Sequence, residues 1–325
     1  MSLGDVQAAG AEAVFDAMVR SMCVEAKDIL SLELVRTDGI DWPVAAPGAH
    51  VDLQVPGVGV RQYSVLPSNA ARSLWIGVQR DPGTRGGSRW VHDSLRPAQG
   101  VRVGAPRNHF TLDTGSGPAC LIGGGIGITP LLAMADALRR TQRVWELHYC
   151  VRSRDRAGFA ALLQRYGERV HLHVDAEVGA PLHIEGLVRN AAPGTHFYCC
   201  GPAAMLGGFA SATAHLLPEY CHVEHFAAPA VSAELPSGSF VVELARTGGE
   251  LVVPPARSIL DVLLDVGVDV RHSCRSGVCG SCETRVIAGT PDHRDVVLSP
   301  RERAEGHTLM VCCSRASGDR IVLDL

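Results

Sequence analysis

The amino-acid sequence predicts three domains in one chain: an antiparallel β-barrel, an α/β domain with a parallel sheet, and a C-terminal α+β domain. Three observations support this prediction. Short alternating apolar runs broken by Pro and Gly fill residues 22–113, strands alternate with helical patterns over 114–229, and a mixed segment with clustered cysteines fills 240–325. With 325 residues, the chain is long enough for each part to bury its own core.

The composition is that of a globular protein. Hydrophobic residues make up 46% of the chain and charged residues 20%, which argues against disorder. The net charge of -4 and the scattered basic residues give no electrostatic reason to expect a nucleic-acid partner. No run approaches the roughly 18 to 20 apolar residues of a membrane-spanning helix, and the N-terminus lacks a secretory signal. We therefore expect a cytoplasmic protein without a membrane partner.

Each predicted element follows from a local pattern. Residues 1–21 are an Ala-rich N-terminal extension that fits either a helix or a tail. In the barrel segment, the stretches HVDLQV and SLWIGVQ alternate in the manner of barrel strands. In 114–229, the strand-like ACLIG, WELHYCV and VHLHV alternate with the helix-like TPLLAMADALRR and RAGFAALLQRYG. That alternation indicates a parallel sheet with crossover helices.

The C-terminal domain, 240–325, follows a predicted linker at 230–239 that is rich in Ala, Pro, Ser and Gly. Its first strands are FVVELA and ELVVP. A helix from Ser258 through Val266 comes next, with Ser258 as a suitable N-cap.

Four cysteines of this domain have the spacing of an iron-sulfur site. Cys274, Cys279 and Cys282 form a C-x4-C-x2-C pattern, and 29 residues separate Cys282 from Cys312. This is the plant-type 2Fe-2S spacing. A structural zinc site is the alternative, but zinc ligands usually come in two separated pairs. Spacing leaves Cys313 open as the fourth ligand, because adjacent strand residues point to opposite faces.

A glycine-rich stretch after the strand at 119–123 predicts a phosphate cradle. Bare amides and a helix N-terminus suit a pyrophosphate, and we expect Thr129 as the N-cap and Pro130 at the first helical position. The spacing departs from G-x-G-x-x-G, so a tight turn without a ligand stays possible. Cys200, Gly201 and Pro202 end another predicted strand, where parallel sheets bind ligands.

A third stretch, RQYSV, places Arg61, Tyr63 and Ser64 on a barrel strand. About twenty residues later Gly86, Gly87 and Ser88 offer amides and a hydroxyl. An Arg beside such a loop could bind a phosphate.

Together and in this order, these stretches resemble the phthalate dioxygenase reductase family, which includes vanillate demethylase reductase subunits. The resemblance covers about residues 22–325. It implies a flavin-binding β-barrel, an NAD-binding α/β domain and a plant-type ferredoxin domain of the β-grasp fold. It also implies FMN, NADH and a 2Fe-2S cluster as cofactors and a Rieske-type oxygenase of aromatic catabolism as the protein partner, with FAD and NADPH left open.

The family motifs carry over residue by residue. The flavin motif corresponds to Arg61, Tyr63, Ser64, Gly86, Gly87 and Ser88, with Phe226 as a candidate stacking residue. The nicotinamide motif corresponds to Gly124, Gly125, Gly127, Thr129, Pro130, Cys200, Gly201 and Pro202. The pattern Cys-x-Ser-Arg matches Cys312, Ser314 and Arg315, which favours Cys312 over Cys313. The segment PDHRD, residues 291–295, also matches the family, and this resemblance implies a structural role for it within the ferredoxin domain.

The expected mechanism assigns the chemistry to the cofactors. NADH gives up two electrons as a hydride, the cluster accepts one, and the flavin converts between them. No acid-base side chain is therefore nominated as catalytic, and Ser64 and Cys200 are expected near the contact of flavin and nicotinamide. Arg152 and Arg154 suit a 2'-phosphate, whereas Asp155 would repel it.

Two further expectations concern isolated residues. Cys23, Cys120, Cys150 and Cys221 are predicted to be small buried residues. His92, His109, His171 and His173 lack ligand spacing with a second partner, so we interpret them as solvated or core histidines. Two functional alternatives remain: a reductase with the same cofactors that serves a diiron or heme oxygenase, and a zinc-stabilised binding module.

Overall fold

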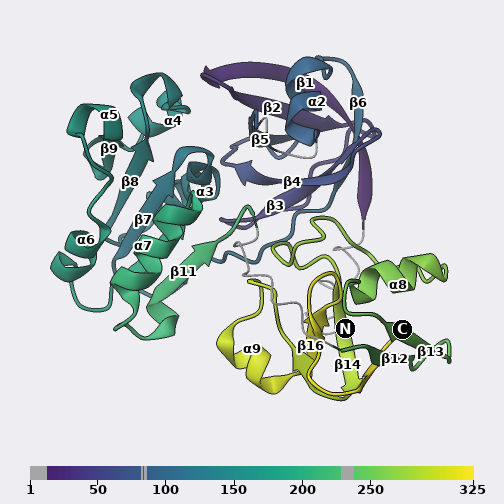
Figure 1. Cartoon of the computed structure of the whole chain (residues 1–325). Helices are drawn as coiled ribbons and strands as arrows, with labels where there is room; N and C mark the ends of the chain where they lie inside the picture. The colour runs from purple at the N-terminus through teal and green to yellow at the C-terminus, as the bar shows by residue number, and fades with distance from the viewer. Residues whose placement is uncertain (1–12, 82, 84–85, 228–237) are drawn as a thin grey trace, which may run out of the picture. The chain divides into compact units, whose positions relative to one another are not determined.

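The computed structural model describes residues 13–81, 83, 86–227 and 238–325. The chain divides into two compact units, Met1–Glu224 and His225–Leu325, and each is described by itself. The first unit holds a barrel and a parallel sheet, and the second holds a smaller mixed sheet with two helices (Figure 1).

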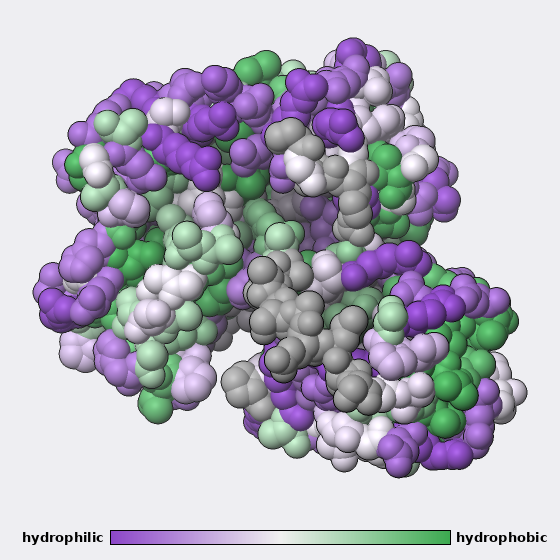
Figure 2. Space-filling model, in the orientation of Figure 1, coloured by the Kyte–Doolittle hydropathy of each residue, from purple (hydrophilic) through white to green (hydrophobic). Residues whose placement is uncertain are grey.

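The barrel closes on itself in the strand order β1-β2-β5-β4-β3-β6, with every neighbouring pair antiparallel. Each strand has a neighbour on both sides, although β4 pairs with β5 only at Val65 and Leu66 and β3 pairs with β6 only at Leu53. Alternate residues point inward, among them Val19, Leu34 and Ile76, which are fully buried. Hydrophilic residues are interspersed with hydrophobic ones on the barrel's visible face (Figure 2). The strands are β1 (Val14–Ala26), β2 (Ile29–Arg36), β3 (His50–Val55), β4 (Gly59–Leu66), β5 (Ser73–Gln79) and β6 (Gly100–Gly104), and the short helix α2 (Gly87–Asp93) precedes β6.

The predicted N-terminal extension, 1–21, is wrong for residues 14–21, because these form the first part of β1. Ala17 and Val19 are buried inside the barrel, and β1 pairs with both β2 and β6. The alternation is weak in sequence because a small alanine fills one inward position and the register shifts between Val19 and Ser21. Residues 1–12 lie outside the described part of the chain.

The second sheet of this unit is parallel, in the order β11-β10-β7-β8-β9. Helix α3 packs on one face, over Leu121, Tyr149 and Tyr198, and helices α6 and α7 pack on the other, over Ile122 and Phe197. The strands are β7 (Ala119–Gly124), β8 (Trp145–Val151), β9 (Val170–Val174), β10 (His196–Cys200) and β11 (Cys221–Glu224). The helices are α3 (Ile128–Leu138), α4 (Ala160–Gln164), α5 (Asp175–Val178), α6 (Ile184–Asn190) and α7 (Ala203–Thr213), with 3-10 turns at Gly125–Gly127, Arg154–Arg156, Gly167–Arg169 and Pro218–Tyr220.

The second unit has a five-stranded sheet in the order β13-β12-β18-β14-β16 and a two-stranded sheet of β15 and β17. Ser258 caps helix α8 through a reciprocal capping box with Asp261, as the predicted N-cap requires. The predicted linker lies mostly within 228–237, outside the described residues. The elements are β12 (Phe240–Leu244), β13 (Glu250–Val253), α8 (Ile259–Asp265), β14 (Glu283–Ala288), β15 (Pro291–Asp292), α9 (Pro300–Glu305), β16 (Thr308–Met310), β17 (Arg315–Ala316) and β18 (Arg320–Leu323).

All eleven cysteines are free thiols. Cys120 and Cys150 are buried as expected, whereas Cys221 is half-buried and Cys23 is exposed. The expectation for Cys23 was wrong because this residue lies on the outer side of the barrel strand β1. Among the described residues, no helix is both long enough and apolar enough to span a bilayer.

Candidate functional site

The predicted flavin motif is assembled where strand β4 meets the start of helix α2. A Cβ atom added to Gly87 would lie 2.5 Å from Cγ of Arg61, so only glycine lets the helix pack against that side chain. Gly86 has φ of 96°, a left-handed conformation that favours glycine. The Ser88 hydroxyl accepts a bond from the backbone N–H of Asp81 at 3.1 Å, which closes the loop. The structure thus brings Arg61 together with the predicted phosphate loop.

Ser64 supplies a polar atom that fits a ligand. Its side chain is 4% exposed, and its Oγ has no hydrogen-bond partner within the described part of the chain. Buried hydroxyls in proteins are nearly always bonded, so an orphaned one inside a predicted cofactor motif is consistent with a missing group. Tyr63 packs against the barrel core instead, and burial raises its pKa to about 12. The residues present therefore fit FMN.

His50 is a neighbour of Ser64 that sequence reasoning missed. The two residues pair directly in the β3–β4 register, so their side chains lie on the same face of the sheet. His50 stacks on His109, with ring centroids 5.8 Å apart. Burial and the Arg107 charge lower the pKa of His50 to about 3, which makes its imidazole neutral. A single histidine on a predicted strand does not indicate a site residue, so no feature of the sequence selected His50.

The glycine-rich turn after β7, the predicted dinucleotide turn, is packed tightly against the end of β10. A Cβ on Gly124 would lie 2.7 Å from Cδ of Pro202, and one on Gly127 would lie 2.3 Å from the carbonyl oxygen of Cys200. Gly125 has φ of 55°. The turn is therefore packed against Cys200, Gly201 and Pro202 at the carboxyl edge of the sheet, and the predicted nicotinamide residues lie together.

The predicted N-cap of helix α3 is wrong. Gly127 occupies the cap, because the 3-10 turn Gly125–Gly127 continues directly into the helix at Ile128. The Thr129 hydroxyl donates to the carbonyl of Ile126 at 2.8 Å. Pro130 is the third helical residue and not the first. The backbone N–H groups of the first four helical residues have no acceptor within the helix, so proline costs no hydrogen bond at this position.

Thr129 instead marks where the barrel meets the parallel sheet. A Cβ on Gly77 of strand β5 would lie 2.7 Å from Cγ2 of Thr129 and 2.9 Å from Cζ of Phe159. Gly125 faces the same strand, since its Cβ would be 3.9 Å from Oε1 of Gln79. Strand β5 therefore packs directly against the dinucleotide turn.

Glu224 is a second residue that sequence reasoning missed, although it lies two residues before the predicted stacking residue Phe226. It pairs with Cys200 in the parallel register of β10 and β11. Its Oε2 is inaccessible to solvent and without a partner among the residues described, and burial raises the pKa of this carboxyl to about 8. Burial, together with the Glu224 carboxylate, raises the pKa of the Cys200 thiol well above its usual range.

Arg154 and Phe226 are two further residues that the sequence predicted to contact a cofactor. Arg154 donates two bonds to Glu177, at 2.8 and 2.6 Å, so its guanidinium is engaged by a carboxylate. Phe226 is 45% exposed and follows β11 at the start of the second unit. Its predicted stacking role stays a prediction.

The cysteines of the second unit form a connected set of thiols. The Cys274 and Cys279 side chains are within hydrogen-bonding reach of each other, as are those of Cys282 and Cys312. These neighbouring thiols, together with burial, raise the pKa of Cys279 and of Cys282. The chain supports the set closely: the Ser276 N–H points at Sγ of Cys274 at 3.3 Å. Four thiols in this arrangement fit a 2Fe-2S cluster.

Cys312 and Cys313 differ in their surroundings. Cys312 is buried beside Cys282. Cys313 is half-buried, and its Sγ would be only 2.6 Å from a Cβ atom added to Gly277. Ser314 accepts the N–H of Arg294. The buried Arg315 guanidinium donates to the carbonyls of Gly238, Pro254, Pro255 and Arg257.

The comparisons with known proteins agree with this domain set. Residues 242–317 match the model of the 2Fe-2S iron-sulfur cluster binding domain. Vanillate O-demethylase oxidoreductase of Pseudomonas sp. (strain HR199 / DSM 7063) is 41% identical over 319 residues, covering 96% of this chain and 100% of the relative. The chain belongs to the phthalate dioxygenase reductase family.

Solved structures extend the comparison. Phthalate dioxygenase reductase, described as a modular structure for electron transfer from pyridine nucleotides to [2Fe-2S], matches with a TM-score of 0.70 and 35% identity, over 96% of this chain and 98% of that one. An intact type IV self-sufficient cytochrome P450 monooxygenase matches with a TM-score of 0.90 and 36% identity, over 96% of this chain but only 41% of that longer chain.

Membership of the phthalate dioxygenase reductase family confirms several expectations. The chain is an oxidoreductase with a flavin barrel, a nicotinamide domain and a C-terminal 2Fe-2S domain. The expected fold class is confirmed, and so, at the level of the family, are the electron-transfer reductase function and the set of FMN, NADH and 2Fe-2S.

Proposed function

We propose that this chain is the cytoplasmic, NADH-dependent reductase component of a Rieske-type non-heme iron oxygenase of aromatic catabolism. The observation that carries the proposal is the set of thiol contacts Cys274–Cys279 and Cys282–Cys312 in a chain whose first unit packs a dinucleotide turn against a flavin barrel. The similarity to vanillate O-demethylase oxidoreductase and to phthalate dioxygenase reductase supports this class of partner.

The residues present indicate which side chains would hold each group. Arg61 and the Gly86–Ser88 loop would bind the FMN phosphate, and the Ser64 hydroxyl would bond to its ring system. The turn at Gly124–Gly127 would bind the pyrophosphate of NADH, with the nicotinamide at Cys200–Pro202. Cys274, Cys279, Cys282 and Cys312 would ligate the irons. When bound, these groups supply hydride transfer and its division into single-electron steps.

The task of the chain is to position and to insulate. A protonated Glu224 and a neutral Cys200 thiol leave the nicotinamide end of the sheet without fixed negative charge at neutral pH, because burial disfavours both anions. Arg61 offers a fixed positive charge to a phosphate. Arg154 is held by Glu177, and this favours NADH over a cofactor that carries a 2'-phosphate.

The first test is spectroscopic and chemical. The purified chain should contain one flavin, two irons and two acid-labile sulfides, and its visible absorption should bleach on addition of NADH. A colourless protein that holds zinc at the four thiols would contradict the proposal and would favour the binding-module alternative.

The partner is tested separately. The same reductase is mixed with a Rieske oxygenase component and, separately, with a heme monooxygenase, the second candidate because the cytochrome P450 structure contains a closely matching segment. We expect NADH-driven reduction of the Rieske centre and little reduction of the heme. Preferential reduction of the heme would overturn the choice of partner while leaving the cofactor assignment intact.

A further inference from the structure

The amino ends of strands β7 and β8 bring together a thiol, a carboxylate and an imidazole that the proposed electron transfer does not use. Cys120 and Glu146 are paired in the parallel register of β7 and β8, and His148 lies two residues further along β8 on the same face. This is the face on which helices α6 and α7 pack, and it is remote from the dinucleotide turn at the carboxyl end of β7.

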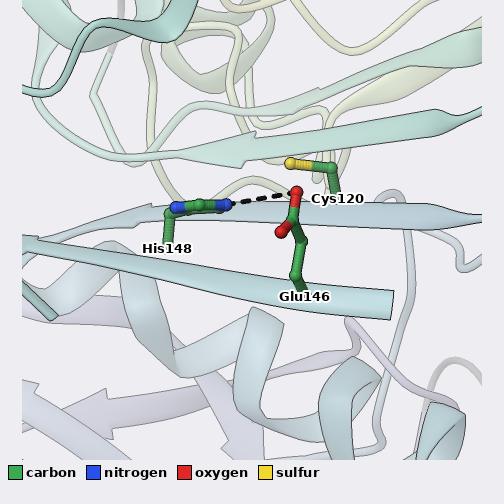
Figure 3. A group of neighbouring side chains, drawn as sticks. All are labelled: Cys120, Glu146 and His148. Carbon is green, nitrogen blue, oxygen red and sulfur yellow. Dashed lines mark ion pairs between the residues drawn. The ribbon is translucent and has the colours of Figure 1, made fainter. Parts of the chain in front are cut away.

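The three side chains converge on one point. Sγ of Cys120, a carboxylate oxygen of Glu146 and a ring nitrogen of His148 all lie within 4.8 Å of one another. Figure 3 shows the carboxylate of Glu146 between the imidazole of His148 and the thiol of Cys120. Nε2 of His148 is 3.2 Å from Oε1 of Glu146, and the Cys120 thiol donates to the same carboxylate.

His148 is aimed into this group and is not otherwise engaged through Nε2. Its side chain is only 9% exposed, and among the described residues its Nε2 makes no hydrogen bond of good geometry. His171 from β9 stacks on His148, with ring centroids 4.8 Å apart, and its Nε2 is 3.7 Å from Oε2 of Glu146. A fourth polar group thus steadies the carboxylate from its outer side.

The donor set has the chemistry of a zinc site. One sulfur, one nitrogen and one oxygen donor suit a borderline metal ion, and three protein ligands with an open fourth position are typical of exchangeable zinc. In a tetrahedral site, ligand atoms are about 3.3 to 3.5 Å apart, so the observed group needs only small side-chain movements. Glu146 is 44% exposed, which leaves a path for the ion and for a water ligand.

We propose that Cys120, Glu146 and His148 form a second metal site, separate from the iron-sulfur thiols, that binds one Zn²⁺ with water as the fourth ligand. The ion ties β7 to β8 at the edge of the sheet away from the nicotinamide. Binding forms the Zn–S bond as the Cys120 S–H bond breaks, and the proton leaves to solvent, so each zinc bound releases one proton. No electron is transferred.

The test uses the intact holoprotein with its flavin and iron-sulfur cluster in place. Zinc is titrated by calorimetry in two buffers of different ionisation enthalpy, and the bound ion is examined by X-ray absorption at the zinc edge. We expect one zinc per chain, one proton released, and one sulfur with three nitrogen or oxygen neighbours. A spectrum with four sulfurs would mean that zinc occupies the iron-sulfur thiols, and it would overturn the proposal.

Variants distinguish the site from adventitious binding. Cys120→Ala and Glu146→Gln should each weaken zinc binding by at least about 100-fold, because each removes a direct ligand. Cys199→Ala is the matched control: this thiol is buried on the same face of the neighbouring strand β10 but lies outside the converging group, so zinc affinity should be unchanged.

NADH-driven ferricyanide reduction by each variant checks that the fold is intact, and it should match the parent protein because none of these side chains lies in the flavin or nicotinamide site. Equal zinc affinity in all three variants, or no zinc retained by the parent at micromolar free zinc, would overturn the proposal.

Discussion

Cys200 and Glu224 are direct partners in the parallel register of β10 and β11; Cys200 is fully buried, and Oε2 of Glu224 is inaccessible to solvent. A parallel sheet binds its ligand at this carboxyl edge, so the pair lies where the nicotinamide is expected. Glu224 has no counter-charge among the described residues that would stabilise its anion, and burial raises its pKa to about 8. Its proton is therefore held by the fold.

Glu224→Gln is expected to change how stability depends on pH. Folding raises the pKa of the Glu224 carboxyl above its ordinary 4.5. The protonated carboxyl therefore supports the folded state fully below about pH 4.5, and this contribution to stability is lost as the pH rises through about 8. Relative to the variant, the native protein should lose up to about 4 kcal/mol between pH 5 and pH 9, as an upper bound. Urea unfolding followed by flavin fluorescence at several pH values measures this difference. A difference between the two proteins that does not vary with pH would contradict the prediction.

Ser64→Ala should slow flavin reduction without loss of the fold. The buried Oγ is without a partner in the described residues, so its removal costs the barrel little, whereas a bond to the flavin ring would be lost. We expect stopped-flow reduction by NADH to slow by about 10- to 100-fold, equivalent to a lost bond of about 1.5 to 3 kcal/mol. Ser73→Ala is the control, because Ser73 is also buried on the barrel but donates to Glu33 at 2.6 Å. Equal slowing in both variants would contradict a specific role for Ser64.

Cys312→Ser and Cys313→Ser should differ in their iron content. Cys312 lies beside Cys282, so its replacement removes an iron ligand and should abolish the visible cluster spectrum. Cys313 also lies near Cys312, but its Sγ packs against Gly277, and we expect its replacement to leave iron and acid-labile sulfide close to the parent values. The reverse result would assign the fourth ligand to Cys313.

Gly127→Ala and Gly207→Ala should have effects of opposite sign. An alanine at 127 would place its Cβ 2.3 Å from the backbone carbonyl oxygen of Cys200, which cannot move without shifting β10. We expect a loss of about 3 kcal/mol or more in unfolding free energy and weaker NADH binding. Gly207 lies on the exposed side of helix α7 with nothing within 4 Å of the added atom, so alanine there should stabilise by about 0.5 to 1 kcal/mol. Denaturant titration with parallel measurement of NADH affinity checks both.

Local patterns predicted the parts of this chain whose signal is local. The cysteine spacing and the Ser258 cap depend on residues a few positions apart, and the structure has the four thiols together and the capping box formed. Thr129 was misplaced because the polypeptide entered helix α3 through a 3-10 turn, which no single residue type signals. Strand β1 was missed because alanine gives a weak alternation.

Sites made by strand pairing were beyond prediction from spacing. Glu224 is 24 residues from Cys200 in sequence, and Cys120 is 26 residues from Glu146, yet each pair is in direct register. At the level of the sequence, the histidines were judged by their spacing to one another. His148, however, lies beside Cys120 on the neighbouring strand β7 and Glu146 on its own strand β8. Only the order β11-β10-β7-β8-β9 shows which distant residues become neighbours.

Gly77 bears on how precisely hydride transfer can be aligned. Because this residue has no side chain, the backbone of β5 approaches the side chains of Thr129 and Phe159 closely. This close contact restricts thermal motion of the barrel relative to the parallel sheet. The hydride donor on the nicotinamide and its acceptor on the flavin can then be kept at a reproducible separation. A methyl group at position 77 would act as a spacer, and turnover would become more sensitive to temperature and viscosity than it is in the parent enzyme.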